Sequence, residues 1–207
     1  TCHGKENQIL INKAIDNNCL YYVGSEQDKL DRWLNTAKFY NIDFFVTIDG
    51  DDPFFDFNII DLAFDSYLKN NSDFIKCSDI TPGLFTYGIK YSALKKVCEI
   101  KDTDETEMMW VFFESLQNIK IKDLNKKIDI RLLNKKIRLT LDYIEDHRFM
   151  TKLISKYQKN KINITSLEIN KILNQFPELN FINKDRISEW MKNQKNKIVF
   201  KIKNEKK

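Results

Sequence analysis

Residues 44–53 read Phe-Phe-Val-Thr-Ile-Asp-Gly-Asp-Asp-Pro, an apolar run that passes directly into a turn rich in carboxylates. The run 44–48 is too short for a helix and is closed by Gly50 and Pro53, which is typical of a fully buried, central parallel strand. In open α/β sheets, ligands bind in the crevice beyond the carboxyl ends of the strands. We therefore expect the acids after this run to face a bound group.

These acids are Asp49, Asp51 and Asp52. Two carboxylates about 4 Å apart repel by roughly 4 kcal/mol at an effective dielectric constant near 20, so a cation is the natural third partner. Gly50 is expected to let the backbone turn tightly, and Pro53 to fix the direction in which the chain leaves. An acidic turn whose Asp residues only cap the next helix explains the same spacing, and both interpretations stay open.

Size and composition predict one α/β domain without a membrane span. The chain has 207 residues, 42% of them hydrophobic, so it can bury roughly 70% of its unfolded surface in a single core. Its apolar runs stay well below the roughly 20 residues that cross a bilayer. The polar residues 1–7 lack the pattern of a signal peptide, and we expect a cytoplasmic protein.

The net charge of +4 is concentrated at the end of the chain. Residues 184–207 hold nine Lys or Arg against three Asp or Glu, a local +6, which leaves residues 1–183 at −2. The sequence therefore predicts an α/β domain over 1–183 and a basic helix or tail over 184–207. No basic face with interleaved aromatic residues is visible elsewhere, so nucleic acid is not an expected partner.

The cysteines are widely spaced. Cys2, Cys19, Cys77 and Cys98 form no C-x-x-C pair, so neither a zinc site nor a disulfide framework is expected. Because Cys19, Cys77 and Cys98 have apolar neighbours, we expect them to be buried, reduced thiols.

The first part of the chain alternates short apolar runs with helical patterns, the rhythm of a doubly wound, three-layer parallel sheet. A helix-start signature, S-x-x-D, begins at Ser25, and Asp56 is placed to cap a later helix. The pattern places strands at residues 20–23, 44–48 and 73–77, and helices at residues 6–17, 30–37 and 59–68.

The second part repeats the arrangement of an apolar strand that ends in acids. A predicted strand ends at Asp142, with Glu145 and Asp146 at the head of the next helix, where acids also favour the helix dipole. Residues 108–116 are apolar nearly all round, so they form a buried helix, an aromatic wall for a ligand, or a subunit contact that leaves a homodimer open. Further strands are predicted at residues 84–89, 128–133, 137–141 and 198–200, and further helices at residues 91–99, from 165 to 173 and around 187–191.

Three segments together resemble the cytidylyltransferases, which include spore-coat-polysaccharide-type, acylneuraminate and 3-deoxy-manno-octulosonate enzymes. They are residues 24–32 (Gly-Ser-Glu-Gln-Asp-Lys-Leu-Asp-Arg), 49–53 (Asp-Gly-Asp-Asp-Pro) and 138–146 (Arg-Leu-Thr-Leu-Asp-Tyr-Ile-Glu-Asp). The resemblance implies a three-layer nucleotide-diphospho-sugar transferase fold, glycosyltransferase-A-like and Rossmann-like, with a mainly parallel sheet. It also implies an enzyme that uses CTP and Mg²⁺ to convert an acidic or amino sugar into a CMP-sugar for surface polysaccharide biosynthesis.

The same resemblance assigns the site residues. Asp51 matches the metal-binding acid of the central motif, with a catalytic role, and Asp142 matches the second metal-binding acid. Arg32 is carried over as the other catalytic group. Mg²⁺ takes one or two carboxylates together with phosphate oxygens and water, which two acids at strand ends can supply. Nucleotide and substrate contacts are expected from Gly24, Ser25, Asp31, Arg32, Gly50 and Asp52.

The family begins with a strand and a basic, glycine-containing loop that wraps the triphosphate, and Thr1 has no such segment before it. The chain is therefore expected to be incomplete at its N-terminus and to bind CTP weakly, because Mg²⁺ offsets only two of about four negative charges on a triphosphate. Two other functions stay open: a catalytically inactive relative that serves as a binding or scaffold domain, and a basic-tailed RNA-binding module. Burial of Asp51 and Asp142 against basic side chains would favour the inactive relative.

Overall fold

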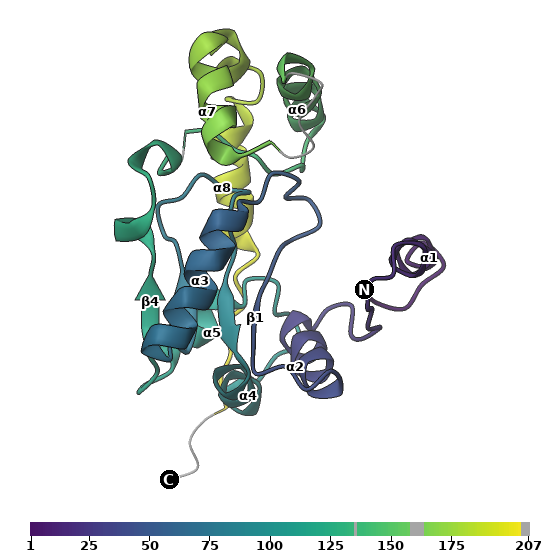
Figure 1. Cartoon of the computed structure of the whole chain (residues 1–207). Coiled ribbons are helices and arrows are strands. Elements are labelled where there is room, and N and C mark those ends of the chain that lie inside the picture. Colours follow the sequence, from purple (N-terminus) through teal and green to yellow (C-terminus); the bar gives the residue numbers. More distant parts are fainter. Residues whose placement is uncertain (135, 158–163, 204–207) are drawn as a thin grey trace. The chain divides into compact units, whose positions relative to one another are not determined.

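The computed structural model describes residues 1–134, 136–157 and 164–203, and Figure 1 shows the course of the chain. The chain divides into two compact units. The first unit consists of Thr1–Phe45, Lys90–Ile119 and Asn196–Lys207, and the second of Val46–Ile89 and Lys120–Lys195. Within the described residues, no helix is long and apolar enough to cross a membrane.

The first unit is built on helices. The helices α2 (Lys29–Phe39) and α4 (Tyr91–Ile100) pack against each other and bury Leu30 and Leu94 completely. The helix α5 (Trp110–Ser115) lies within the apolar segment 108–116 and buries Phe112 and Phe113, which confirms the predicted buried helix. The helix α1 (Gln8–Asp16) is also present, but each of its residues is at least partly exposed.

Asp28 organises the start of α2. Its Oδ1 accepts hydrogen bonds from the backbone N–H of Asp31 at 3.0 Å and from the hydroxyl of Thr106 at 2.9 Å, and its Oδ2 pairs with Lys101. The predicted helix start at Ser25 is therefore three residues early, because Ser25 accepts the N–H of Asp28 and Asp28 itself caps the helix. Ser25 and Asp28 thus both accept a backbone N–H near the start of the helix, but the residue that caps the helix is Asp28.

The predicted strand at residues 20–23 is wrong. This segment is irregular backbone, with Leu20 79% exposed, and only Gly24 forms an isolated parallel bridge, to Cys2. The carbonyl of Tyr21 accepts a hydrogen bond from the side chain of Tyr40 at 2.6 Å rather than from a neighbouring strand. A short apolar run thus lacks the ladder that would make it a strand.

Four strands form one sheet among the described residues, in the order β1-β3-β2-β4. They are β1 (Phe44–Val46), β2 (Phe74–Lys76), β3 (Gly88–Lys90) and β4 (Ile121–Asp123). The pair β2/β3 is antiparallel and the pair β2/β4 is parallel, so the sheet is mixed and not mainly parallel. β1 lies at an edge of this order, which corrects the prediction of a central strand.

The other elements of the second unit follow the predicted helices closely. Asp56 caps α3 (Phe57–Asn70) as expected, because its carboxylate accepts the N–H of Asn58 at 2.8 Å. In Figure 1, α6 and α7 lie beside each other, as their contacts also show. The remaining elements are η1 (Asn125–Lys127), η2 (Ile130–Leu132), α6 (Ile144–Lys156), α7 (Ser166–Gln175), η3 (Pro177–Phe181) and α8 (Arg186–Asn196).

The strands predicted at residues 128–133 and 137–141 are wrong. The carboxylate of Asp129 accepts hydrogen bonds from the backbone N–H and from Nε of Arg131, at 3.0 and 2.9 Å, and residues 130–132 form the short helix η2, which Asp129 caps through that N–H. Residues 137–141 run as irregular chain. The expected strand at 198–200 is replaced by an isolated antiparallel bridge between Lys101 and Ile202, and residues 204–207 of the basic tail lie outside the described residues.

Gly83 is a position where the fold requires a glycine. Its φ of +95° is in the left-handed region, and a Cβ there would lie 2.6 Å from the backbone of Leu139. The adjacent Pro82 accepts the N–H of Leu139 at 2.8 Å, so two backbones meet at this turn. The turn therefore holds the segment that leads to Asp142 in place.

Candidate active site

The acidic turn after β1 lies in the second unit. Asp51 is exposed, whereas Asp52 is only 8% exposed and donates its N–H to the carbonyl of Asp49 at 3.1 Å. Gly50 has no left-handed φ, and a Cβ at this position would meet nothing within 4 Å in the described part of the chain. The chain turns at Gly50 as expected, but this turn does not use the conformational freedom of glycine.

The two acid-bearing segments lie side by side. The backbone N–H of Leu141 donates a hydrogen bond of 2.9 Å to the carbonyl of Asp51, and Asp142 is the next residue. The backbone thus brings together two positions that are far apart in the sequence, as the resemblance implied. Whether both carboxylates bind one ion stays a prediction.

The carboxylate of Asp142 is held through one of its oxygens. Oδ2 accepts a hydrogen bond of 2.5 Å from Nη1 of Arg138 and another from the hydroxyl of Thr140. Among the described residues, Oδ1 accepts no hydrogen bond, and the side chain is 26% exposed. Asp142 therefore has one oxygen held by two side chains and one oxygen without a hydrogen bond from the described residues.

Arg138, which pairs with Asp142, also forms a buried ion pair with Asp146. Arg138 is 1% exposed and Asp146 0% exposed, and Nη2 of Arg138 donates to both carboxylate oxygens of Asp146. Asp146 also accepts hydrogen bonds from Asn183 at 2.9 Å and from the N–H groups of Asp142 and Tyr143 at 3.0 and 2.8 Å. The interpretation of Asp146 as a helix-start residue is thus right, with an ion pair added that the pattern did not reveal.

The start of α6 is also tied to α8. Nη2 of Arg186 donates to Glu145 at 3.1 Å, and this hydrogen bond holds the pKa of Glu145 below its usual range. The guanidinium of Arg186 lies 5.2 Å from the ring of Tyr143, and that of Arg138 lies 5.1 Å from the same ring. These contacts hold the backbone that directly follows Asp142.

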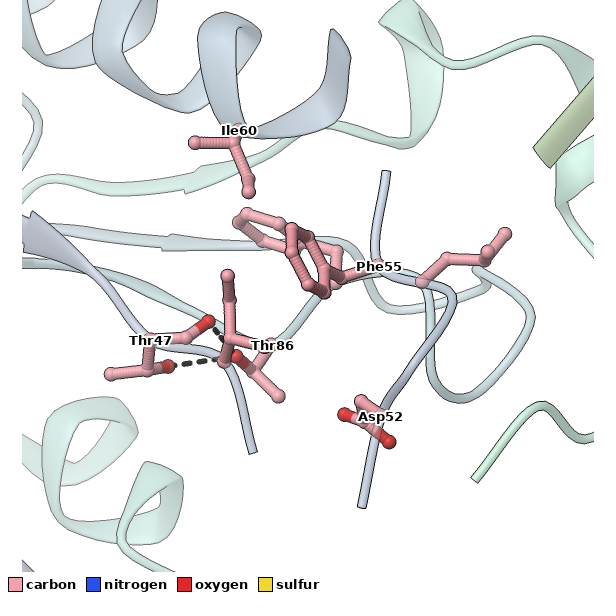
Figure 2. Close-up of a pocket in the computed structure, with 8 residues that line it drawn as sticks. Thr47, Asp52, Phe55, Ile60 and Thr86 are labelled. Carbon is pink, nitrogen blue, oxygen red and sulfur yellow. Dashed lines mark hydrogen bonds between the residues drawn. The ribbon is translucent and has the colours of Figure 1, made fainter. Parts of the chain in front are cut away.

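A small hollow adjoins the acidic turn. It holds about 180 Å³ of space, part of which is open to solvent. Figure 2 shows Phe55 and Ile60 in one part of the hollow and Asp52 in another, while the hydroxyls of Thr47 and Thr86 meet at 2.8 Å. The hollow is mainly apolar, with one carboxylate at its side. Its lining consists of Thr47, Ile48, Asp52, Phe55, Ile60, Leu84, Phe85 and Thr86.

The other predicted site residues lie in the first unit, where the structure brings them together. Nη1 of Arg32 donates to the carbonyls of Ser25 and, at 3.2 Å, of Glu26. A Cβ on Gly24 would lie 3.0 Å from Cγ of Arg32, so the glycine leaves room for that side chain. Asp31 is in the first turn of α2. One nitrogen of Arg32 is therefore committed to the backbone.

Within the described ranges, no group of three or more His, Cys, Asp or Glu side chains is arranged to hold a metal. Mg²⁺ commonly uses one or two carboxylates and completes its octahedron with phosphate oxygens and water. A magnesium site of this kind at Asp51 and Asp142 stays a prediction.

The fold matches that of a solved cytidylyltransferase structure from Leptospira borgpetersenii, with a TM-score of 0.76 over 86% of this chain and 76% of that chain. At 23% sequence identity, this likeness shows the fold. The chain therefore has a mixed-sheet α/β fold of the kind found in a cytidylyltransferase, which confirms the resemblance at that level.

A relative in sequence is an uncharacterized protein of Methanocaldococcus jannaschii, 31% identical over 163 residues. The alignment covers 78% of this chain, and the chain spans 66% of the length of that relative. No family model matches the chain.

Proposed function

We propose that the protein is a cytidylyltransferase that uses CTP and Mg²⁺ to activate an acidic or amino sugar as a CMP-sugar for surface polysaccharide biosynthesis. The hydrogen bond from Leu141 to the carbonyl of Asp51 carries this proposal, because it sets the two acid-bearing segments side by side in a chain with a cytidylyltransferase fold. The three-layer glycosyltransferase-A-like arrangement and the spore-coat-type branch belong to the same proposal.

In the proposed reaction, an oxygen of the sugar bonds to the α-phosphorus of CTP, its proton is released, and the bond to the β-phosphate breaks to free pyrophosphate. Bound Mg²⁺ would neutralise the phosphate oxygens during this displacement. The exposed Asp51 and the open Oδ1 of Asp142 are the groups that would hold the cation. Arg32, beside Gly24 and Ser25, would supply positive charge to the nucleotide or to an acidic sugar.

A second candidate function is a relative that keeps the fold and binds a partner without catalysis. One specific observation favours it: Asp142 already pairs with the buried Arg138, so part of its charge is offset inside the protein. This candidate predicts a folded chain that releases no pyrophosphate with any sugar. The first candidate is favoured because Asp51 and Asp142 are both exposed residues that a ligand can reach.

The test is pyrophosphate release from CTP and Mg²⁺ with a panel of keto-acid and amino sugars. We expect release with at least one sugar, and loss of most of that turnover in Asp51→Asn, with the far-UV circular dichroism unchanged because Asp51 is exposed. Asp65→Asn is a matched control, since Asp65 is an exposed acid of the same unit that pairs with Lys69 across one helical turn. Full activity of Asp51→Asn would refute the assignment.

A further inference from the structure

Arg138 holds an unusual position for an arginine next to a proposed site. Its side chain is 1% exposed, and its guanidinium lies between the rings of Tyr143 and Trp190, at 5.1 and 5.5 Å. A group buried to this degree cannot touch a substrate or a cation in solution. Any effect of Arg138 on the site must therefore pass through the residues it contacts.

The contacts of Arg138 lead to Asp142 by two routes. Nη1 donates directly to Oδ2 of Asp142 and also, at 3.2 Å, to the hydroxyl of Thr140, which in turn donates to the same Oδ2. Nη2 is used by Asp146, whose carboxylate also accepts the backbone N–H of Asp142. Side chain and backbone of Asp142 are thus fixed by one buried network.

The charges of the network leave Asp142 able to act as a ligand. The guanidinium of Arg138 pairs with two carboxylates, those of Asp142 and Asp146, so the three groups together carry a net charge of −1. Both oxygens of Asp146 accept hydrogen bonds from this guanidinium. All of the hydrogen bonds to Asp142 from described side chains go to Oδ2. Oδ1 is the oxygen that accepts none of these hydrogen bonds, on a side chain that is 26% exposed.

We propose that Arg138 and Thr140 are positioning residues that hold Oδ2 of Asp142 inward and so direct Oδ1 toward a divalent cation. The proposal rests on the proposed function, because it assumes that Asp142 is a cation ligand. Partners that orient a metal-binding carboxylate usually change metal affinity about 10- to 100-fold when they are removed. The same range is expected here.

The test measures binding of Mn²⁺ alone to the 207-residue chain, from the electron paramagnetic resonance signal of the free ion. Asp142→Asn defines the part of the binding that depends on this carboxylate. Thr140→Val removes the hydroxyl with little change of shape, and we expect it to raise the Kd about 10- to 100-fold. Thr140→Ser keeps the hydroxyl and should restore the wild-type affinity.

Two further variants separate positioning from general effects on folding. Arg138→Lys keeps the charge but loses the planar guanidinium, whose two terminal nitrogens donate to Asp142 and Asp146. It should therefore also weaken Mn²⁺ binding. Thr151→Val is the matched control, because the Thr151 hydroxyl donates to the carbonyl of His147 within α6 and both residues are exposed. Its Kd should equal that of the wild type.

The outcomes are distinct. If Asp142→Asn loses the site but Thr140→Val and Arg138→Lys bind Mn²⁺ as the wild type does, the positioning role is wrong and the cation site stands. Equal weakening by Thr140→Val and Thr140→Ser would also refute positioning by the hydroxyl. If Asp142→Asn binds Mn²⁺ as the wild type does, Asp142 does not bind the cation in the protein alone and this inference fails, whereas the proposed function is tested separately by pyrophosphate release.

Discussion

Replacing Arg138 by methionine should cost the protein a large part of its stability. The variant removes the cation that faces Asp146, which is 0% exposed, and so leaves a buried carboxylate with hydrogen bonds but no opposite charge. Breaking a buried ion pair from one side costs about 3–5 kcal/mol. In a protein of this length each kcal/mol shifts Tm by about 2–4 °C, so the expected loss is roughly 6–20 °C.

Urea unfolding followed by circular dichroism measures the loss of free energy, and a thermal melt measures the shift of Tm. The control is Arg131→Met, because Arg131 forms its ion pair with Asp129 on the surface, and such pairs contribute about 0–1 kcal/mol. The double variant Arg138→Met with Asp146→Asn removes the stranded charge and should recover part of the stability. If Arg138→Met loses no more stability than the Arg131→Met control, the central role of the buried pair is refuted.

Three other predictions concern two glycines and the buried thiols. Gly83→Ala should lower the free energy of unfolding by more than about 1 kcal/mol, whereas Gly50→Ala should leave it unchanged or raise it slightly; equal losses in urea melts would contradict this difference. Burial raises the pKa of Cys77 and of Cys98 to about 12, so at pH 8 iodoacetamide should modify the exposed Cys19 first, as peptide mass spectrometry will show. Because both folded pKa values lie above the ordinary thiol value, the stability that these neutral thiols contribute is present below about pH 9 and is lost as the pH rises toward about 12. Alkylation of Cys77 at the rate of Cys19 would contradict the prediction.

The sequence was a good guide to helices and a poor guide to strands. Helices such as α3 and α6 carry their own periodicity and caps, so local pattern suffices. The run at residues 20–23 looked like a strand, but an apolar run becomes a strand only when a partner backbone lies alongside it. The strand β4 was missed although residues 119–122 alternate Ile and Lys, which is a readable strand signal.

The sequence indicated that the two acid-bearing segments are related, but not which side chains hold Asp142. The motifs placed Asp51 and Asp142 at the ends of apolar segments, and the backbone does bring those segments together. The burial of Arg138 was not visible, because it depends on Asn183 and Trp190, which lie 45 and 52 positions further along the chain.

Cys19 was expected to be buried because its neighbours are apolar, but it follows the exposed helix α1 and is itself exposed.

A crystal structure of the protein grown with CTP and Mn²⁺ tests the central claim most directly, because the anomalous signal of manganese locates the cation without assumptions. The account predicts one peak bonded to a carboxylate oxygen of Asp51, to Oδ1 of Asp142 and to phosphate oxygens, with Oδ2 of Asp142 still bonded to Arg138 and Thr140. A peak that is bonded to neither acid, or CTP bound with no cation near them, would contradict the account.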